Sequence, residues 1–589
     1  MTRRKLSAAQ RCSGAAALGL SAVAAVVPAA IATSLLQETL EIYEIQGPGL
    51  SSPYQGVVVR SDGNLVTAVG RDGFFIQTPD ARDDGDPDTS NGLYVVADVS
   101  PEVAVGQLVD VIGTVVEFFG WTQLREPQVF VRGGGNPLPA PIDLDRRTPS
   151  PNQPWPAIEL ERFEGMRLRV ASGTVAGPSD GFGDAPVVAG AQRPFREPGI
   201  LYPGIAGLPV FDGNPETFWL APGGLGGQGT PLAGGSAFTA VGVLVEEFDE
   251  YRLWPTELEV GTVPTLPRPV RSRRGGELTV ATQNLERLDR AATEPPYATR
   301  LGKLSRQIRG VLRAPDVVAV QEVKDLATLA DLASRIRADD PSLVYTARHE
   351  EAPRTDEFDV GFLVRDTVDI LSVSQIGANV IFSLDGSLLN DRPPLVLEAS
   401  WRGHDPPLPL TVVVVHQRSL LGIDDPEDGE RVRRKRHEQA VWLAGWIQQR
   451  QGERPDERLI VIGDFNAFEF TDGYVDVMGQ VTGRPDQGGA LIPVVDVLEP
   501  PLTDWVGWLP AAERYSYIFG GDAEALDHVL TTRAADPWVA TVAVSRGNAD
   551  APQSLVTDPS TAAGSSDHDG LVLYLGPHVR RPDGRRPLP

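Results

Sequence analysis

The sequence predicts an all-β amino-terminal half and an α/β carboxyl-terminal half. Before about residue 264, short strand-like runs alternate with glycine- and proline-rich turns, a rhythm typical of small barrels and sandwiches. After about residue 276, buried β-branched runs alternate with segments of helical spacing, which indicates strands connected by helices. All seven histidines also fall after residue 276. The chemistry is therefore expected in the carboxyl-terminal half.

The length and charge of the chain set outer bounds on its function. A chain of 589 residues is too long for one hydrophobic core, so about two to four domains are expected. It carries 79 acidic and 53 basic residues, for a formal net charge of -26. This balance excludes a general electrostatic binder of nucleic acid. A polyanionic substrate would have to be met by local basic patches and by divalent cations.

Residues 1–32 are predicted to be a secretory signal peptide. Basic residues precede a small and apolar run, 14–32, which ends in the cleavage pattern Ala30-Ile31-Ala32. The alternative is a transmembrane anchor, which the alanine-rich run, interrupted by Pro28, favours less. Cys12, the single cysteine, lies before this run. The mature chain is therefore expected to be secreted, monomeric, and free of disulfides and of a membrane anchor.

Residues 37–135 are predicted to form a small closed β barrel. Strand-like runs recur at 54–59, 65–69 and 73–77, and 108–118 is predicted to hold two more strands. The Asp-Gly pairs at 62–63 and 72–73 are typical of hairpin turns. Five aromatic side chains are candidates either for stacking on the bases of a single strand or for the barrel core, namely Phe74, Phe75, Phe118, Phe119 and Trp121.

Two proline-rich stretches, 137–156 and 264–276, are predicted linkers. The β-rich region between them, 158–263, is dominated in its middle by glycine, proline and alanine and contains no catalytic constellation. The second linker marks the main domain boundary, and the catalytic domain is expected at 276–577.

Polar side chains stand at the ends of the predicted strands throughout the carboxyl-terminal half. The run 459–462 is apolar, Gly463 permits a sharp turn, and Asp464 and Asn466 then point to one side of the chain. An acid and an amide placed together suit a metal-bound phosphate. Further polar residues stand at the ends of other strands, namely Gln283-Asn284, Gln321-Glu322, His416, Asp527 and Asp567-His568.

These motifs stand in the order found in the endonuclease/exonuclease/phosphatase superfamily, which the chain resembles over about residues 276–575. The superfamily includes pancreatic deoxyribonuclease and the apurinic endonucleases. The likeness is greatest to bacterial extracellular nucleases, some of which carry an OB-fold-like module of the kind expected at 37–135. The resemblance implies an α/β fold of two mixed β-sheets packed face to face with flanking helices.

The resemblance also implies a divalent cation and a general base. Glu322, Asn284 and Asp567 would hold the cation, which would be Mg²⁺ or Mn²⁺, with Ca²⁺ as a supporting ion. It would neutralise the phosphate oxygen and the charge that develops on it. His568 would take a proton from the attacking water, and Asp527 would fix the tautomer of that histidine.

Five further residues complete the implied site. Asp464 and Asn466 would position the water and the phosphate, and His416 would act at the leaving or a non-bridging oxygen. Arg392 matches a phosphate-contacting arginine of the superfamily. Arg418 stands near the place of a usual lysine and is expected to substitute for it.

Three points stay open at this level. The carboxylate that orients His416 is either Glu357 or Asp359. His528 is expected to pack in the core, pointing away from the site that its neighbour faces. The basic run 431–436 is either a solvated helix face or a contact for the backbone of a polyanionic substrate.

The sequence therefore predicts a secreted, metal-dependent phosphodiesterase. As the resemblance implies, its substrate would be DNA, or alternatively RNA, cut with low sequence specificity to leave 5′-phosphate ends. The first rival is a lipid enzyme of the same superfamily, a sphingomyelinase or phosphoinositide phosphatase, for which Trp505–Leu509 is the candidate apolar segment. The second rival is a non-catalytic extracellular binding protein on this fold, which loss of a metal or histidine position would favour; none is lost.

Overall fold

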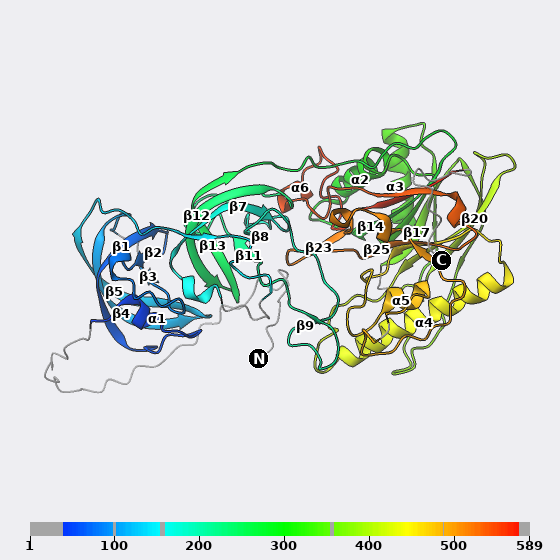
Figure 1. Cartoon of the computed structure of the whole chain (residues 1–589). Helices are drawn as coiled ribbons and strands as arrows, with labels where there is room; N and C mark the ends of the chain where they lie inside the picture. Colours follow the sequence, from blue (N-terminus) through cyan, green and yellow to red (C-terminus); the bar gives the residue numbers. More distant parts are fainter. Residues whose placement is uncertain (1–38, 98–101, 153–158, 354–357, 487, 577–589) are drawn as a thin grey trace, which may run out of the picture. The chain divides into compact units, whose positions relative to one another are not determined.

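The computed structural model of the chain (Figure 1) describes residues 39–97, 102–152, 159–353, 358–486 and 488–576. The predicted signal peptide, with Cys12, lies outside the described residues. Among the helices of the described part, none combines the length and the apolar character needed to cross a membrane.

The chain divides into two compact units. Unit 1 comprises Met1–Ile142, Leu160–Leu168 and Gly242–Thr256, and unit 2 comprises Asp143–Glu159, Arg169–Val241 and Glu257–Pro589. Most of the second β-rich region therefore belongs to the same unit as the predicted catalytic region.

Unit 1 contains a closed five-stranded barrel in the order β1-β2-β3-β5-β4, as predicted. Asp62-Gly63 forms a bulge inside β1 and not a hairpin turn, because pairing with β4 shifts register between Ser61 and Asn64 and then continues. The 108–118 run is one strand and not two. The elements are α1 (Ile42–Gln46), β1 (Val58–Val69), β2 (Gly73–Gln77), β3 (Gly92–Val96), β4 (Leu108–Phe118) and β5 (Trp121–Gly133), with a 3-10 turn at Asp80–Arg82.

The aromatic side chains of the barrel separate into two groups. Trp254, also in unit 1, packs on the rings of Phe75 and Trp121 with centroids 5.8 and 5.6 Å apart. Base stacking is therefore the wrong prediction for the three buried candidates, Phe74, Phe75 and Trp121. Phe118 and Phe119, at the end of β4 and just beyond it, are 46% and 71% exposed.

The second β-rich region forms a six-stranded sheet in the order β12-β13-β11-β8-β7-β6 and a two-stranded sheet of β9 and β10. The strands are β6 (Ile142–Leu144), β7 (Arg167–Val175), β8 (Ala185–Val188), β9 (Ile200–Leu201), β10 (Val210–Phe211), β11 (Phe218–Leu220), β12 (Ala237–Glu247) and β13 (Glu250–Val260), with a 3-10 turn at Glu161–Phe163.

Two mixed six-stranded sheets form the catalytic region. The first has the order β16-β17-β15-β14-β27-β26, and its parallel pair is β14 with β15. Its strands are β14 (Leu278–Leu288), β15 (Val317–Val323), β16 (Tyr345–His349), β17 (Asp359–Arg365), β26 (Val539–Val544) and β27 (Leu571–Leu575).

The second sheet has the order β18-β19-β20-β21-β25-β22, and its parallel pair is β20 with β21. Its strands are β18 (Val368–Gln375), β19 (Leu395–Trp401), β20 (Leu408–His416), β21 (Leu459–Asp464), β22 (Thr503–Asp504) and β25 (Asp527–Thr531). A separate hairpin pairs β23 (Tyr517–Phe519) with β24 (Asp522–Glu524). Short 3-10 turns lie at Val506–Trp508, Ala511–Glu513 and Asp536–Trp538.

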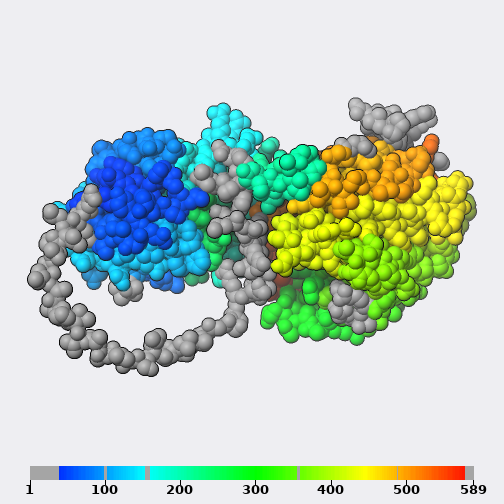
Figure 2. All heavy atoms as spheres, turned by 90° about the horizontal axis from the view of Figure 1, so that it is seen from below, coloured from blue at the N-terminus to red at the C-terminus, as the bar shows by residue number. Residues whose placement is uncertain are grey.

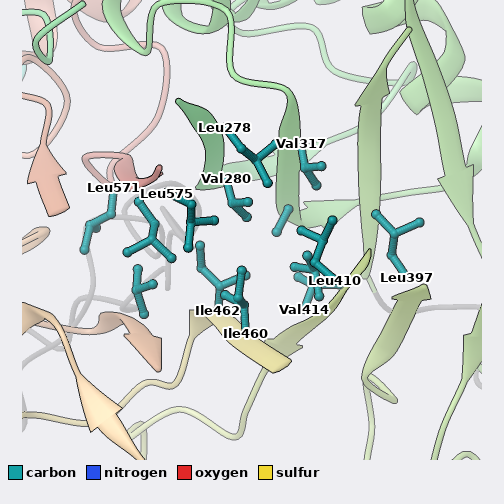
Figure 3. Packing of buried hydrophobic residues seen from close by; sticks show 14 of the residues in the cluster. Leu278, Val280, Val317, Leu397, Leu410, Val414, Ile460, Ile462, Leu571 and Leu575 are labelled. Carbon is teal, nitrogen blue, oxygen red and sulfur yellow. The ribbon is translucent and has the colours of Figure 1, made fainter. Parts of the chain in front are cut away.

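The two sheets pack face to face, which confirms the predicted fold. Figure 3 shows Leu278, Val280 and Val317 of the first sheet in one cluster with Ile460 and Ile462 of the second. Strands with apolar side chains on both faces need cover on the outside as well, and helices supply it. Their bounds are α2 (Tyr297–Arg306), continued by a π-helical turn at Gln307–Val311, α3 (Leu326–Asp339), α4 (Gly429–Glu453), α5 (Val477–Thr482) and α6 (Gln553–Val556).

The helices cover opposite outer faces of this pair of sheets (Figure 1). Leu304 of α2 and Leu332 of α3 pack on the first sheet, while Leu443 of α4 and Met478 of α5 pack on the second. Figure 2 shows α4, in yellow, beside the segment that follows β21, in orange.

The predicted linker 264–276 is packed against the catalytic region. Arg268 and Arg546 exchange two backbone hydrogen bonds of 2.8 and 3.1 Å, and Arg273 pairs with the buried Asp316 at 2.8 Å. The arginines and backbone groups of this proline-rich stretch therefore find partners within unit 2.

Candidate active site

The catalytic candidates lie at one rim because neighbouring strands end in register. His416 of β20 stands opposite Asp464 of β21, and Asp464 stands opposite Asp527 of β25. In the first sheet, Asn284 of β14 stands opposite Gln321 of β15. The Nδ2 of Asn284 donates to the Oδ2 of Asp464 over 3.2 Å, so the two sheets meet through these side chains.

Three residues at this rim, Gly463, Glu322 and Asn466, have unusual backbone angles. Gly463 has a φ of +142°, and a Cβ there would lie 2.2 Å from the carbonyl oxygen of Val415, so only glycine fits. Glu322 and Asn466 have φ of +59° and +48°, the left-handed region that L residues rarely adopt. Such strain typically persists where surrounding structure holds a functional group in place.

His568 and Asp527 form a buried acid–base pair. The Nδ1 of His568 lies 2.7 Å from the Oδ2 of Asp527, and its Nε2 lies 4.0 Å from the Oδ2 of Asp464. Burial alone would lower the pKa of His568, but the carboxylates of Asp527, Asp567 and Asp464 raise it well above its usual value. The ring of Tyr517 lies 4.8 Å from the imidazole. Nδ1 therefore carries the proton that Asp527 accepts, and Nε2 faces the site.

His416 lies on the other side of Asp464, with its Nε2 3.5 Å from the Oδ2 of that residue. Arg392 donates to the same Nε2 over 2.6 Å. Because a guanidinium can only donate, Nε2 must accept, and the imidazole proton lies on Nδ1. Burial, with the positive charges of Arg392 and His568, lowers the pKa of His416 well below its usual range. His416 is therefore neutral at pH 7.

The expected carboxylate partner of His416 is not observed. The Nδ1 of His416 has no hydrogen-bond partner among the described residues. Asp359 accepts from the backbone of Ala352 at 3.1 Å and lies 3.8 Å from His349 instead, because it begins β17 within the first sheet. Glu357 lies outside the described residues.

Carboxylates gather between the two histidines. The Oε1 of Glu322 lies 3.8 Å from the Nε2 of His416 and 3.4 Å from the Nδ2 of Asn284. Burial raises the pKa of Asp464 to about 7, and burial with the nearby Asp567 raises the pKa of Glu286 to about 7. Burial disfavours the charged form of both acids, and the neighbouring carboxylates add to this effect.

This donor set fits a hard divalent cation. Glu322, Asn284, Asp464 and Asp567 offer carboxylate and carbonyl oxygens, which Mg²⁺, Mn²⁺ and Ca²⁺ prefer. Asp567 is exposed, and it follows Ser566, whose hydroxyl donates to the backbone oxygen of Asn284 over 2.8 Å. Both parts of the predicted cation site are therefore tied to the same strand end.

Two predicted residues stand further out. The Nδ2 of Asn466 donates to the backbone oxygen of Gln417 over 3.1 Å, which fixes the turn after β21. Arg418 directs its guanidinium to the backbone oxygen of Leu421 at 3.3 Å. Arg418 lies two residues beyond His416, beside the site and without a described contact to its carboxylates or histidines.

A model of the "Endonuclease/Exonuclease/phosphatase family" matches residues 281–568. This part of the chain belongs to that family. The match begins just before Asn284 and ends at His568, so it spans the whole site described above.

Similar solved structures come from several organisms. A D. rerio TDP2 humanized by 14 mutations is 17% identical, with a TM-score of 0.33, and covers 51% of this chain and 98% of its own. An endonuclease/exonuclease/phosphatase family protein from Bacteroides thetaiotaomicron is 14% identical, with a TM-score of 0.33. The match covers 52% of this chain and 100% of that protein. The human Nocturnin catalytic domain is 15% identical, with a TM-score of 0.34. The match covers 52% of this chain and 96% of that domain. A comparison with curated proteins finds no match.

The basic run of α4 is largely structural in this family member. Lys435 is buried and pairs with Asp391 at 2.7 Å. Arg436 is also buried; it pairs with Asp472 at 3.0 Å and donates to the backbone oxygen of Asn466 at 2.8 Å. Both cations therefore hold the turn and loop beside the site, and neither is free to contact a substrate backbone.

Replacing Arg436 with methionine is expected to destabilise the chain by about 3 kcal/mol, because it leaves the Asp472 carboxylate buried without its ion pair. The thermal midpoint of unit 2 should fall clearly. Arg434→Met is the matched control, since Arg434 makes an exposed pair with Glu430 on the same helix. Equal midpoints for the two variants would refute the structural role of Arg436.

His528 packs away from the site, as expected. Its Nδ1 lies 2.8 Å from Asp504 and its Nε2 lies 2.8 Å from the backbone oxygen of Ala467. Both partners are acceptors, so the ring must carry two protons. Burial opposes this, but Asp504 and the Ala467 carbonyl raise the pKa of His528 to about 9.

The stability of the chain should therefore depend on pH through His528. A raised folded-state pKa gives stability that is complete below the unfolded value, near 6.5, and is lost as pH rises through about 9. The full shift corresponds to about 3 kcal/mol. Thermal midpoints from pH 6 to 10 should fall more steeply for the wild type than for His528→Gln. Parallel curves would show that His528 is not protonated in the fold.

A second carboxylate cluster lies in unit 1. Among the described residues, Glu161, Glu164 and Glu246 have ligand atoms within 4.8 Å of one another and could hold a cation. Burial and the neighbouring Glu161 raise the pKa of Glu164 well above its usual value. A proton on Glu164 would reduce the repulsion among the three carboxylates as a bound cation would. The cluster belongs to a different unit from His416 and His568, and the hydroxyl of Tyr251 donates to its Glu161 at 2.7 Å.

A cavity of about 1030 Å³ in unit 2 is also separate from the catalytic residues. Arg193 and Phe195 of the second β-rich region line it together with Phe468 and Tyr515 of the catalytic region. None of the predicted site residues is among its lining residues.

Three residues of the site escaped prediction. Tyr517 faces His568, Glu286 adds a carboxylate, and Arg436 braces the Asn466 turn. Tyr517 lies in β23, and no pattern in the sequence gave a role for it. Glu286 follows Asn284 by two residues and could have been found from the same alternation that pairs Asp464 with Asn466.

Proposed function

We propose that the chain is a secreted, metal-dependent DNA endonuclease of low sequence specificity that leaves 5′-phosphate ends. The observation that carries this proposal is the arrangement around Asp464: the His568–Asp527 pair lies on one side and the His416–Arg392 pair on the other. Secretion rests on the signal-peptide pattern at 1–32. The family takes its name from enzymes that hydrolyse phosphate esters.

The residues divide the work of phosphodiester hydrolysis. With a divalent cation offsetting the carboxylates that raise its pKa, His568 would be neutral at Nε2 and would accept the proton of the attacking water, and Asp527 would stabilise the imidazolium that results. Arg392 supplies a permanent positive charge to the phosphate and keeps His416 in its Nδ1-protonated form. A divalent cation at the carboxylates supplies the charge that offsets both the acids and the phosphate oxygens.

Burial of three of the four large apolar side chains in the candidate lipid-facing segment favours a nucleic-acid substrate over a lipid; the fourth, Trp508, is 49% exposed. Trp505, Val506 and Leu509 are buried, and the indole of Trp505 donates to Thr531 at 2.7 Å. In unit 1, the exposed Phe118 lies under Arg125, with 4.8 Å from the guanidinium to the ring centroid. A planar cation beside exposed rings suits the stacking of bases.

The test is a substrate panel with the purified full-length chain. Supercoiled plasmid, RNA, sphingomyelin and a soluble phosphomonoester are each incubated with Mg²⁺ or Mn²⁺, with EDTA as control. Conversion of plasmid to nicked and then linear forms, with 5′-phosphate ends, supports the proposal. Exclusive cleavage of sphingomyelin or of the monoester would replace it with a lipid enzyme or phosphatase, and inactivity on all four would favour the binding protein.

A further inference from the structure

Lys303 of α2 is a buried cation enclosed by carbonyl oxygens. Only 1% of the residue is exposed. Its Nζ lies 2.8, 3.0, 3.1 and 2.6 Å from the backbone oxygens of Leu555, Asp558, Thr561 and Ala563. Burial lowers the pKa of Lys303 to about 8, so its ammonium group is still protonated at pH 7.

The cage has the form of a cation site. An ammonium group has three N–H donors, yet four carbonyl oxygens converge on it. Oxygens that surround a point charge, with no single donor direction, are how proteins coordinate hard cations. All four oxygens belong to one short segment, 555–563, which therefore wraps around the charge. The Asp558 side chain adds negative charge nearby.

The caged segment leads directly into the catalytic residues. The backbone N–H of Ser565 donates to the carbonyl of Ala562 at 3.1 Å, beside the cage oxygen of Ala563. The hydroxyl of Ser566 then accepts from the backbone N–H of His568 at 3.1 Å. Displacement of the cage would move Asp567 and His568 with it, because so few residues separate them.

The same helix also holds the opposite side of the site. Arg300, one turn before Lys303, donates to the backbone oxygens of Leu285 and Glu286 at 2.7 and 2.5 Å. These residues directly follow Asn284 within β14, which continues to Leu288. Two residues of α2 therefore hold both sides of the site: Arg300 bonds to the part of β14 that follows Asn284, and Lys303 bonds to the segment that leads to Asp567 and His568.

We propose that segment 555–563 is a cation-binding cage filled by the chain's own Lys303 ammonium, and that Lys303 is thereby a positioning residue for Asp567 and His568. The cage vacated by a short side chain would take a monovalent cation of suitable size, such as K⁺ or NH₄⁺. The part of this inference that concerns turnover rests on the proposed phosphodiesterase function.

The experiment compares Lys303→Ala with Lys303→Met in the full-length chain. Alanine empties the cage, whereas methionine fills it with an uncharged chain of similar length. Arg337→Met, which removes an exposed charge from α3, is the control. Thermal midpoints, and kcat and KM for bis(p-nitrophenyl) phosphate with Mg²⁺ at pH 7, are measured in equal concentrations of potassium, ammonium or tetramethylammonium chloride.

Lys303→Ala is expected to lower kcat by about 10- to 100-fold with little change in KM, as for other losses of positioning. Potassium and ammonium should restore both kcat and the thermal midpoint of this variant, while tetramethylammonium, which is too large, should not. Lys303→Met should also have a lower kcat and thermal midpoint than the wild type, and none of the three salts should restore them. If Lys303→Ala does not fold, Lys303→Gln, which is also shorter than lysine, takes its place in the same comparison.

Two outcomes would overturn the proposal. One is a Lys303→Ala variant as active and stable as Arg337→Met, and the other is a loss that all three salts affect equally. A wild type inactive on every phosphodiester would instead refute the proposed function, and the thermal midpoints in the three salts would still test the cage.

Discussion

Replacing His568 with alanine is expected to lower turnover by about 10²- to 10⁴-fold, the usual contribution of a general base. The Nε2 of this histidine faces the site, and no other described imidazole can replace it, since His416 uses its Nε2 to accept from Arg392. Single-turnover cleavage of a labelled DNA duplex with saturating Mg²⁺ measures the chemical step directly.

Asp527 should act through His568, because its Oδ2 accepts from the imidazole Nδ1 at 2.7 Å. Asp527→Asn alone should therefore lower the rate, yet add little to His568→Ala, since residues that act as one unit are not additive. Additive losses would mean that Asp527 works independently. His404→Ala, at a half-buried site away from the rim, is the control and should keep the wild-type rate.

Stability must be measured alongside these rates. Strand-end positions suggest solvent-facing side chains whose loss should leave stability almost unchanged, but His568 and Asp527 are 6% and 1% exposed. His568→Ala leaves a buried carboxylate without its partner, so a lower thermal midpoint is expected. Rates are compared at a temperature where every variant is folded. A folded His568→Ala variant with near-normal cleavage would refute the mechanism.

The catalytic fold could be predicted because several buried strands, such as β15, β20 and β21, are apolar runs with polar residues at or near their ends. In β20 and β21 the pattern alone places His416 and Asp464 at the same edge, since parallel strands end on one side. Long-range contacts such as that between Asn284 and Asp464 follow only from the packing of two sheets, which the family resemblance implied and local sequence did not.

The barrel was harder to predict strand by strand. β3 and β5 escaped because β3 is short and β5 mixes charged and apolar residues along its length. Asp62-Gly63 looked like a hairpin turn, but tertiary pairing with β4 kept the chain extended through it. A local turn signal yields to the sheet when both flanking segments already have partners.

The roles of buried cations were beyond the reach of sequence patterns. Arg436 and Lys303 look like solvated helix residues, and their partners lie in segments distant along the chain. Desolvating such a charge is costly unless several acceptors converge on it, and only the folded chain shows that convergence. The same limit applies to His416: of its two candidate carboxylates, Asp359 accepts from the backbone of Ala352 at 3.1 Å, and Glu357 lies outside the described residues.

Removing divalent metal is expected to abolish cleavage completely. Glu322, Asp464, Glu286 and Asp567 place four carboxyl groups near one another, and burial together with this mutual repulsion raises the pKa of Asp464 and of Glu286 to about 7. A phosphodiester adds further negative charge, so the site cannot bind and activate it without a cation. EDTA should stop plasmid nicking, and Mg²⁺ or Mn²⁺ should restore it, with Ca²⁺ as a supporting ion.

The position of the cation is tested by two sets of variants. Glu322→Gln should raise the Mn²⁺ concentration for half-maximal activity by more than about 10-fold, since losing even an outer partner of a metal commonly costs that much. Calorimetric titration with Mn²⁺ should show the same weakening without any substrate. Glu246→Gln, in the carboxylate cluster of unit 1, should leave the metal dependence of cleavage unchanged. The reverse pattern would place the essential ion in unit 1, and full activity in EDTA would exclude a metal mechanism altogether.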